Sequence, residues 1–162
     1  MEETESRLPA LGNRGGGWVA LQVVLFVVAA VVGWLGMRWP PPARPWLWVA
    51  GIVALVAGVG LLLAGGAGLG KQLTPFPRPL DAGVLRQDGI YGFARHPIYG
   101  GVLLLLLGWA LVSSPLTLIP FVVAAAFFDA KRRREEVWLV AKYPDYPAYS
   151  ERVPRRFVPF VW

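Results

Sequence analysis

Long apolar blocks separated by short polar segments make up most of the 162-residue chain. Residues 18–37 and residues 46–70 carry no charged side chain. Each block is long enough to cross the hydrocarbon core of a bilayer, which takes about 20 apolar residues as a helix. The first block is also longer than the apolar core of a signal peptide, so we expect a retained span. The pattern therefore predicts two transmembrane helices in the first half of the chain.

Small residues recur at every fourth position of the second block, a spacing that brings one helix backbone close to another. This spacing predicts a face of the second helix that packs tightly against a neighbouring span. The residues form two lines, Ala50, Ala54 and Gly58 on one and Gly60, Ala64 and Gly68 on the other.

A third block, residues 98–128, is also uncharged but is too long for one ordinary span. As a single helix it would measure about 46 Å, whereas the hydrocarbon core is about 30 Å thick. Ser113, Ser114 and Pro115 lie at its middle, where a break is expected. Two interpretations fit this block: one long kinked helix, or a tight hairpin of two short spans.

The distribution of basic residues favours the hairpin. With four spans, every Lys and Arg except Arg38 and Arg44 lies on one side of the membrane. A single third span would move the basic residues from Lys131 onward to the other side, against the positive-inside rule. We therefore predict an all-α fold, a polytopic transmembrane helical bundle forming one membrane domain (1–162) in the plasma (inner) membrane, with both termini cytoplasmic. The four predicted spans are residues 18–37, 46–70, 97–112 and 115–128, of which the last two form a short helical hairpin.

Composition supports a membrane protein and excludes several other classes. Only 16% of the residues are charged, against about a quarter in a soluble domain. The net charge of +6 comes from basic residues that flank the apolar blocks. Basic residues in this position orient spans in the membrane and contact anionic lipid, so they do not indicate nucleic-acid binding. With no cysteine and one histidine, the chain has no disulfide or thiolate nucleophile and a poor ligand set for a metal, so we predict no metal site.

The chain becomes polar after the third block. Asp129 is a plausible N-cap, and residues 130–142 are predicted to form a helix that leaves the membrane. The rest forms a tail rich in Pro, Tyr and Arg, whose apolar end suits docking at the interface or onto the spans. The prediction is thus a cytoplasmic C-terminal helix and tail, and the apolar residues at its end are Phe157, Val158, Phe160, Val161 and Trp162.

Two stretches carry the candidate chemistry: residues 85–101, with the single histidine, and residues 131–139, with two adjacent glutamates. Each has an ordinary structural interpretation. The Gly and Pro residues of the first indicate a tight turn before a helix, and the two glutamates could pair with Lys131 and Arg132 four residues earlier. The predicted topology, however, places both stretches at the same membrane face, which favours a shared site.

The pattern resembles the signature of the isoprenylcysteine carboxyl methyltransferase and phospholipid methyltransferase superfamily of integral membrane methyltransferases. The first motif is Gly89-x-Tyr91-x-x-x-Arg95-His96-Pro97-x-Tyr99-x-Gly101. It is followed at the family's spacing by Arg133-x-Glu135-Glu136-x-x-Leu139, Tyr146-x-x-Tyr149 and Arg155-Arg156-Phe157-Val158-Pro159. The agreement covers roughly residues 75–160. The chain departs from the family at Gly92, where many members carry a basic residue, at Tyr143-Pro144, where Phe-Gly is frequent, and in having fewer spans than many relatives.

The resemblance implies S-adenosylmethionine as cofactor, bound by two cytoplasmic segments, residues 71–96 and 129–162. An arginine or histidine suits the cofactor's carboxylate, and a glutamate suits its ammonium or ribose hydroxyls. The residues implied for cofactor binding are Tyr91, Arg95, His96, Pro97, Tyr99, Gly101, Glu135, Glu136 and Tyr146. The candidates for catalysis near the acceptor are Arg133, Arg134 and Glu136.

The implied reaction is methyl transfer to a membrane-embedded acceptor, a membrane lipid or a lipid-like or prenylated small molecule, most like isoprenylcysteine carboxyl O-methylation. A carboxylate acceptor needs no base, whereas an amine acceptor must lose a proton to Glu135, Glu136 or His96. Phospholipid amine N-methylation therefore stays open. Two further alternatives are an NADPH-dependent sterol-type reductase, disfavoured because Pro97-Ile98-Tyr99 replaces the usual Asn-Tyr, and a non-enzymatic membrane scaffold. The acceptor and the oligomeric state are left undetermined by the sequence.

Overall fold

The computed structural model describes residues 9–159, and all regular elements in this part of the chain are helical. The all-α prediction is therefore confirmed for the described residues, while the predicted apolar end at Phe160, Val161 and Trp162 lies outside them. The long helices are α2 (Gly16–Leu35), α3 (Arg44–Leu69), α4 (Pro97–Val112) and α5 (Leu118–Lys142), followed by the short α6 (Tyr146–Arg152). Three 3-10 helices join them: η1 (Gly70–Gln72), η2 (Gly89–Gly92) and η3 (Pro115–Thr117).

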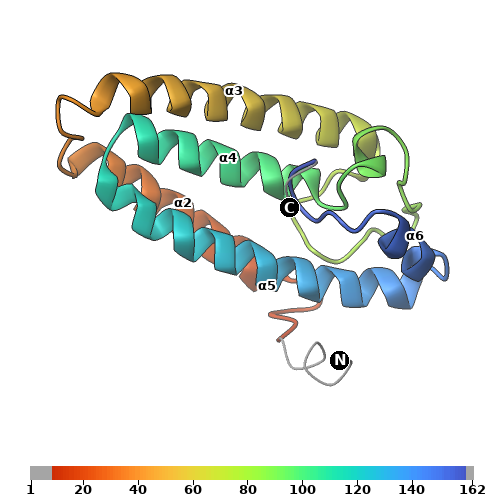
Figure 1. Ribbon diagram of the computed structural model, residues 1–162. Coiled ribbons are helices and arrows are strands. Elements are labelled where there is room, and N and C mark those ends of the chain that lie inside the picture. Colours follow the sequence, from red (N-terminus) through yellow and green to blue (C-terminus); the bar gives the residue numbers. More distant parts are fainter. Residues whose placement is uncertain (1–8, 160–162) are drawn as a thin grey trace.

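The long helices lie side by side, and the connection from α3 to α4 gathers with α6 at one end of the bundle (Figure 1). Two segments, Gly16–Leu35 and Arg44–Gln72, are long and apolar enough to cross a membrane. Only 17% and 11% of their apolar windows is buried inside the protein, so their large side chains face outward. A core helix of a soluble protein would bury one face, whereas outward-facing valines and leucines suit lipid.

The third apolar block forms a hairpin rather than one long helix. The first arm, α4, ends at Val112, and α5 runs back beside it after η3 (Figure 1). At the break the Ser113 hydroxyl donates to the Trp109 carbonyl over 2.5 Å, and the Ser114 hydroxyl accepts from the Leu116 amide over 3.2 Å. These bonds satisfy backbone groups that a helix end would leave open. That each arm crosses the membrane remains a prediction.

The predicted N-cap at Asp129 is wrong, because α5 continues through this residue without a break. The Asp129 carboxylate accepts hydrogen bonds from Arg132 and Arg133, one turn further along the same helix, at 3.0 and 2.8 Å. It therefore stabilises the helix interior instead of starting a new one. Consequently most of the predicted span 115–128 and all of the predicted polar helix 130–142 belong to one continuous helix, α5. The short helix α6 was not predicted.

Helices α3 and α4 pack through glycines whose backbones touch. A Cβ atom on Gly58 would lie 2.8 Å from the Gly101 carbonyl oxygen, and one on Gly101 would lie 2.9 Å from that of Gly58. Gly51 and Gly108 form a second pair of the same kind. The contacting glycines are seven residues apart, the period at which two nearly aligned helices meet on every second turn. The small-residue face was predicted correctly at Gly58, but its line has a period of seven, not four, and the predicted Gly60 faces open space.

Helices α2, α4 and α5 share an apolar core. Phe128 of α5 packs with Leu103 and Leu106 of α4 and with Ala29 of α2. The same cluster contains Phe157 from the C-terminal segment, which is fully buried. This part of the predicted tail therefore docks onto the bundle, beside the start of α4.

Candidate functional site

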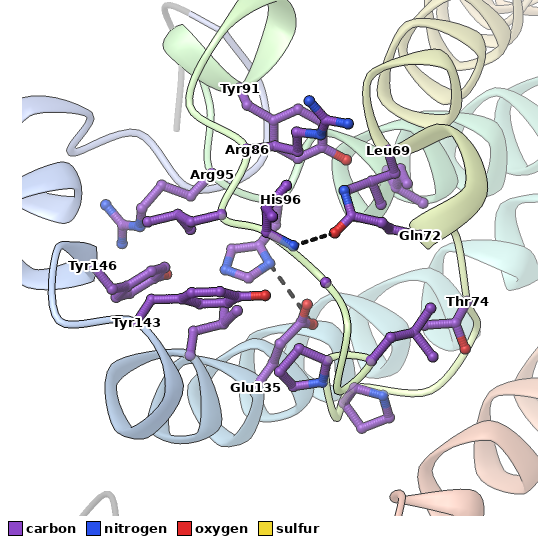
Figure 2. A pocket seen from close by; sticks show the side chains of 18 of the residues that line it. Leu69, Gln72, Thr74, Arg86, Tyr91, Arg95, His96, Glu135, Tyr143 and Tyr146 are labelled. Atoms are coloured by element: carbon purple, nitrogen blue, oxygen red, sulfur yellow. Dashed lines mark hydrogen bonds and ion pairs between the residues drawn. The ribbon is translucent and has the colours of Figure 1, made fainter.

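A pocket lies at the end of the bundle where the two motif stretches meet. Its walls come from the connection between α3 and α4, the first turn of α4, the C-terminal half of α5, and α6 (Figure 2). Residues 85–101 and 131–139 are therefore brought together, as the predicted topology required. The polar and aromatic side chains that line the pocket are Gln72, Thr74, Phe76, Arg86, Tyr91, Arg95, His96, Tyr99, Glu135, Tyr143, Tyr146 and Tyr149.

The backbone at Arg95 and His96 is fixed by the C-terminal segment. The Arg95 amide donates to the Arg155 carbonyl over 3.0 Å, and the His96 amide donates to the Arg156 carbonyl over 2.7 Å. Pro97 then starts α4 at a position where a helix needs no amide donor. As a result His96 becomes the residue that precedes the helix, and its ring is held at the pocket wall.

Glu136 joins the two motifs by accepting three charge-assisted hydrogen bonds. One oxygen accepts from Arg95 Nε at 3.1 Å and from His96 Nε2 at 3.0 Å, and the other accepts from Arg132 Nη1 at 2.6 Å. Burial alone would raise its pKa, but the hydrogen bond from His96 and the two guanidinium charges outweigh burial and hold the pKa of Glu136 well below its usual range. Glu136 is therefore a fixed anion between α4 and α5, and it does not line the pocket.

Glu135, by contrast, faces the pocket. Its carboxylate accepts a 2.5 Å hydrogen bond from the Tyr99 hydroxyl, and His96 Nδ1 lies 3.8 Å away (Figure 2). The His96 and Tyr99 rings stack with centroids 5.5 Å apart. Burial raises the pKa of Glu135 above its usual range, although the neighbouring His96 and the Tyr99 hydrogen bond oppose the rise. This carboxyl is thus the one of the adjacent pair that is available to a ligand.

Lys131 is almost completely buried behind Glu135. Its ammonium donates to Gln22 Oε1 of α2 at 2.7 Å and to the Pro75 carbonyl at 3.1 Å, and it lies 5.2 Å from the centre of the Tyr99 ring. Burial lowers the pKa of Lys131 to about 8, against the opposing charge of Glu135. The residue ties α2, α5 and the pocket loop together.

Tyrosines from both motifs line the pocket. The Tyr91 hydroxyl donates to the Gly65 carbonyl over 3.2 Å, and the Tyr149 hydroxyl donates to the Tyr91 carbonyl over 2.7 Å. The Tyr146 ring packs edge-on against Tyr149 with centroids 5.8 Å apart. Its hydroxyl is buried near Glu136 but lacks the geometry of a hydrogen bond with any described residue. Burial and the Glu136 charge raise the pKa of Tyr146, so the hydroxyl stays protonated.

Besides Glu136, four of the residues predicted for the site lie outside the pocket. Pro97 shapes the start of α4, and Gly101 contacts Gly58 in the helix pair. Arg133 is half exposed and pairs with Asp129 at 2.8 Å, and the Arg134 guanidinium lies 4.6 Å from the Trp138 ring. The sequence also suggested that the two glutamates pair with the basic residues four positions earlier. Glu136 does pair with Arg132, whereas the Lys131 ammonium bonds to groups other than Glu135.

The sequence did not identify Arg86 as a site residue or Lys131 as the buried cation beside the site. Arg86 lines the pocket and lies in the stretch 85–101, but it precedes the spaced motif that begins at Gly89, and Lys131, which does not line the pocket, was interpreted as part of a topology signal. A signal for Lys131 was present, because it precedes Glu135 by one helical turn and so lies on the same helix face.

The fold and the pocket define a small helical membrane protein with a polar, aromatic-lined site at one end of its bundle. The sequence model of the phospholipid methyltransferase family matches residues 46–146, from the start of α3 to the start of α6. The chain belongs to this family of integral membrane methyltransferases, so the resemblance drawn from the motifs is confirmed. A search of curated proteins found no match to the chain.

Proposed function

We propose that the protein is an S-adenosylmethionine-dependent methyltransferase that acts on a membrane-embedded acceptor. The observation that supports this most strongly is the meeting of His96 and Tyr99 from the first motif with Glu135 from the second in one buried pocket. Membership of a methyltransferase family supports the same reaction class. Neither observation depends on the predicted number of spans.

The residues of the pocket fit the chemical groups of this cofactor. The Glu135 carboxylate suits a sulfonium or an ammonium, and the Tyr99 and Tyr146 rings offer faces to a cation or to adenine. The buried Tyr146 hydroxyl and Arg86 Nε have no hydrogen-bond partner among the described residues, which leaves them open to a polar ligand. When bound, S-adenosylmethionine supplies an activated methyl group for transfer to a nucleophile.

The proposed roles of the protein side chains follow from their contacts. Glu135 binds the cationic part of the cofactor, and Tyr99 orients Glu135 through their hydrogen bond. Glu136 acts as a positioning residue, because it touches Arg95 and His96 but not the pocket. Aligning the reacting groups and excluding water are then the main contributions of the site.

For Arg133 and Arg134, which were predicted to be catalytic, we propose a role in binding the acceptor only. Both residues lie on the turn of α5 that carries Glu135, but neither lines the pocket. At that position we assign them contact with an anionic part of the acceptor at the membrane surface.

The acceptor class is the finer part of the proposal. The motifs favour a prenylated carboxylate, which is already nucleophilic and needs no base. A second candidate, the amine head group of a phospholipid, is favoured by Glu135, because a buried carboxylate with a raised pKa can accept the proton that an amine must lose. Methylation of membrane extract with radiolabelled cofactor separates the two: base-labile label identifies an ester, and base-stable label in a phospholipid identifies an amine.

The proposed setting is the plasma (inner) membrane, with four spans and both termini cytoplasmic. The outward-facing apolar side chains of α2 and α3 and the hairpin of α4 and α5 support this topology. It places the pocket at the cytoplasmic face, where the cofactor is available. Cysteines introduced at Arg44 and Glu151 should react with an impermeant maleimide from opposite sides of the membrane; labelling from the same side would contradict four spans.

Binding of S-adenosylhomocysteine to the purified full chain tests the proposal directly. We expect saturable binding by calorimetry. Glu135→Gln should weaken S-adenosylmethionine, which carries the sulfonium, at least about tenfold, and should weaken S-adenosylhomocysteine, which lacks it, less, since the change removes the charge that faces the cation. Glu151→Gln on α6 is the matched control, because that residue is exposed and lies outside the pocket. A folded wild-type sample that binds no S-adenosylhomocysteine at millimolar concentration would refute the function.

A further inference from the structure

The pocket is lined by two arginines, and within residues 9–159 only one of them has hydrogen-bond partners for its side chain. Arg95 Nε donates to Glu136 at 3.1 Å, and its Nη1 donates to the Val153 carbonyl at 2.6 Å and to the Ser150 carbonyl at 3.3 Å. Through these bonds the Arg95 guanidinium holds α5 and the C-terminal segment against the start of α4. Arg95 is therefore poorly placed to bind the anionic group of a ligand as well.

Arg86, in contrast, makes no hydrogen bond or ion pair through its side chain with any residue between 9 and 159. It is partly buried, and its Nε is fully buried without a partner. A fully buried N–H donor such as this Nε is almost always paired, because the desolvation of an unpaired donor costs free energy. An arginine left open in this way, on a pocket wall, indicates an oxyanion as its missing partner.

The backbone on both sides of Arg86 is anchored, so its side chain starts from a fixed position. Leu85 packs into the cluster of Tyr146, Tyr149 and Val153. The Gln87 side chain accepts a hydrogen bond from Arg152 of α6. The loop thus presents Arg86 to the pocket between two attachments to the C-terminal region, and little conformational freedom has to be lost when a ligand binds.

The charges of the pocket are separated in space. In Figure 2 Arg86 and Glu135 lie on opposite sides of His96. The pocket therefore offers a cation at one side and a carboxylate at the other, with the His96 ring between them in this view. A ligand with its own anionic and cationic groups at different positions matches this arrangement.

We propose that Arg86 is the carboxylate-binding residue of the pocket and holds the amino-acid end of S-adenosylmethionine, away from Glu135. This assignment rests on the proposed function and replaces Arg95 or His96, the residues first expected to bind the carboxylate. The guanidinium suits this group because its planar donors match the two oxygens of a carboxylate. Arg86 could instead bind an anionic group of the acceptor. In the first case the loss of Arg86 weakens binding of the cofactor, and in the second it weakens binding of the acceptor.

The test compares two ligands that differ only in the carboxylate: S-adenosylhomocysteine and its decarboxylated analogue. Their affinities are measured by calorimetry on the detergent-solubilised full chain and on the variants Arg86→Gln and Arg86→Lys. We expect Arg86→Gln to weaken S-adenosylhomocysteine about 10- to 100-fold and to leave the analogue unchanged, since a hydrogen bond to a charged group has this magnitude. Arg86→Lys, which keeps the charge but not the planar donors, should give an intermediate loss.

Arg78→Gln is the matched control, because Arg78 lies in the same loop, is exposed, does not line the pocket and donates to the Asn13 carbonyl. Unchanged affinity of Arg86→Gln for both ligands would assign Arg86 to the acceptor and overturn the proposal. Equal weakening of both ligands would show a general effect on the pocket and overturn it too. If the wild type binds neither ligand, the methyltransferase function itself fails, which is a different result from either of these.

Discussion

Helix α4 meets α3 along its length through backbone contacts, whereas its first turn meets α5 and the C-terminal segment through charged side chains. In the helix pair, Gly58 and Gly101 touch without any side chain between them. At the first turn, by contrast, Glu136 connects Arg95, His96 and Arg132 in one network. We call these regions the glycine interface and the polar joint. The first should be sensitive to any added atom, and the second to any lost partner.

The largest effect is expected from breaking the polar joint. Glu136→Ala leaves the buried Arg132 guanidinium, the largely buried Arg95 guanidinium and His96 without their carboxylate, which we expect to cost about 3–5 kcal/mol of unfolding free energy. Reversible unfolding in mixed micelles, followed by tryptophan fluorescence, measures this loss. Glu151→Ala on the exposed face of α6 provides the control. A loss no greater than that of the control would show that the joint does not stabilise the fold.

A smaller effect is expected from filling the glycine interface. Gly58→Ala places a methyl group 2.8 Å from the Gly101 carbonyl oxygen and 3.0 Å from the Leu105 amide, so the helices must separate. Overpacking of this kind costs about 1–3 kcal/mol. Gly60→Ala, two residues away and facing open space, should be neutral or slightly stabilising, because alanine has the higher helix propensity. Equal melting temperatures for the two variants would contradict the close approach of α3 and α4.

The sequence allowed most element positions to be predicted, because their signals are local. The predicted third span, residues 97–112, coincides with α4, since Pro97 favours a helix start and Ser113-Ser114-Pro115 interrupts the helix. The N-cap at Asp129 failed for a local reason: its carboxylate is taken by Arg132 and Arg133, three and four residues further along a continuous helix. The glycine period failed for a tertiary reason, because it depends on how α3 lies against α4 and not on α3 alone.

For the site, the motifs led to the pocket but could not distinguish its members. Glu135 and Glu136 are adjacent, so their side chains leave the helix about 100° apart, and only the rotation of α5 decides which one faces the pocket. The same limit applies to Arg95 and Arg86. The first lies in a motif and is engaged in the polar joint, while the second lies outside the motifs and is open to a ligand.

The effect of pH, at most about 1.4 kcal/mol for each pH unit, concerns Lys131, which links the polar joint to α2 through Gln22. Burial lowers its pKa to about 8 in the folded protein, from 10.5 in an exposed lysine, and the groups that face it are Glu135, Tyr99 and the uncharged Gln22. Between these two pH values the unfolded chain holds a proton that the folded protein has released, so the contribution of Lys131 to stability rises with pH.

We therefore expect the unfolding free energy of the wild type, relative to Lys131→Met, to increase between pH 8 and 10.5 by up to about 1.4 kcal/mol per pH unit. Below pH 8 the difference should be constant, because the lysine is protonated in both states. Lys71→Met, at an exposed position, controls for the general effect of removing a lysine charge and should show no such slope. A flat difference for Lys131→Met would mean that the ammonium is as well solvated in the fold as in water, and the link between α2 and the polar joint would then lie elsewhere.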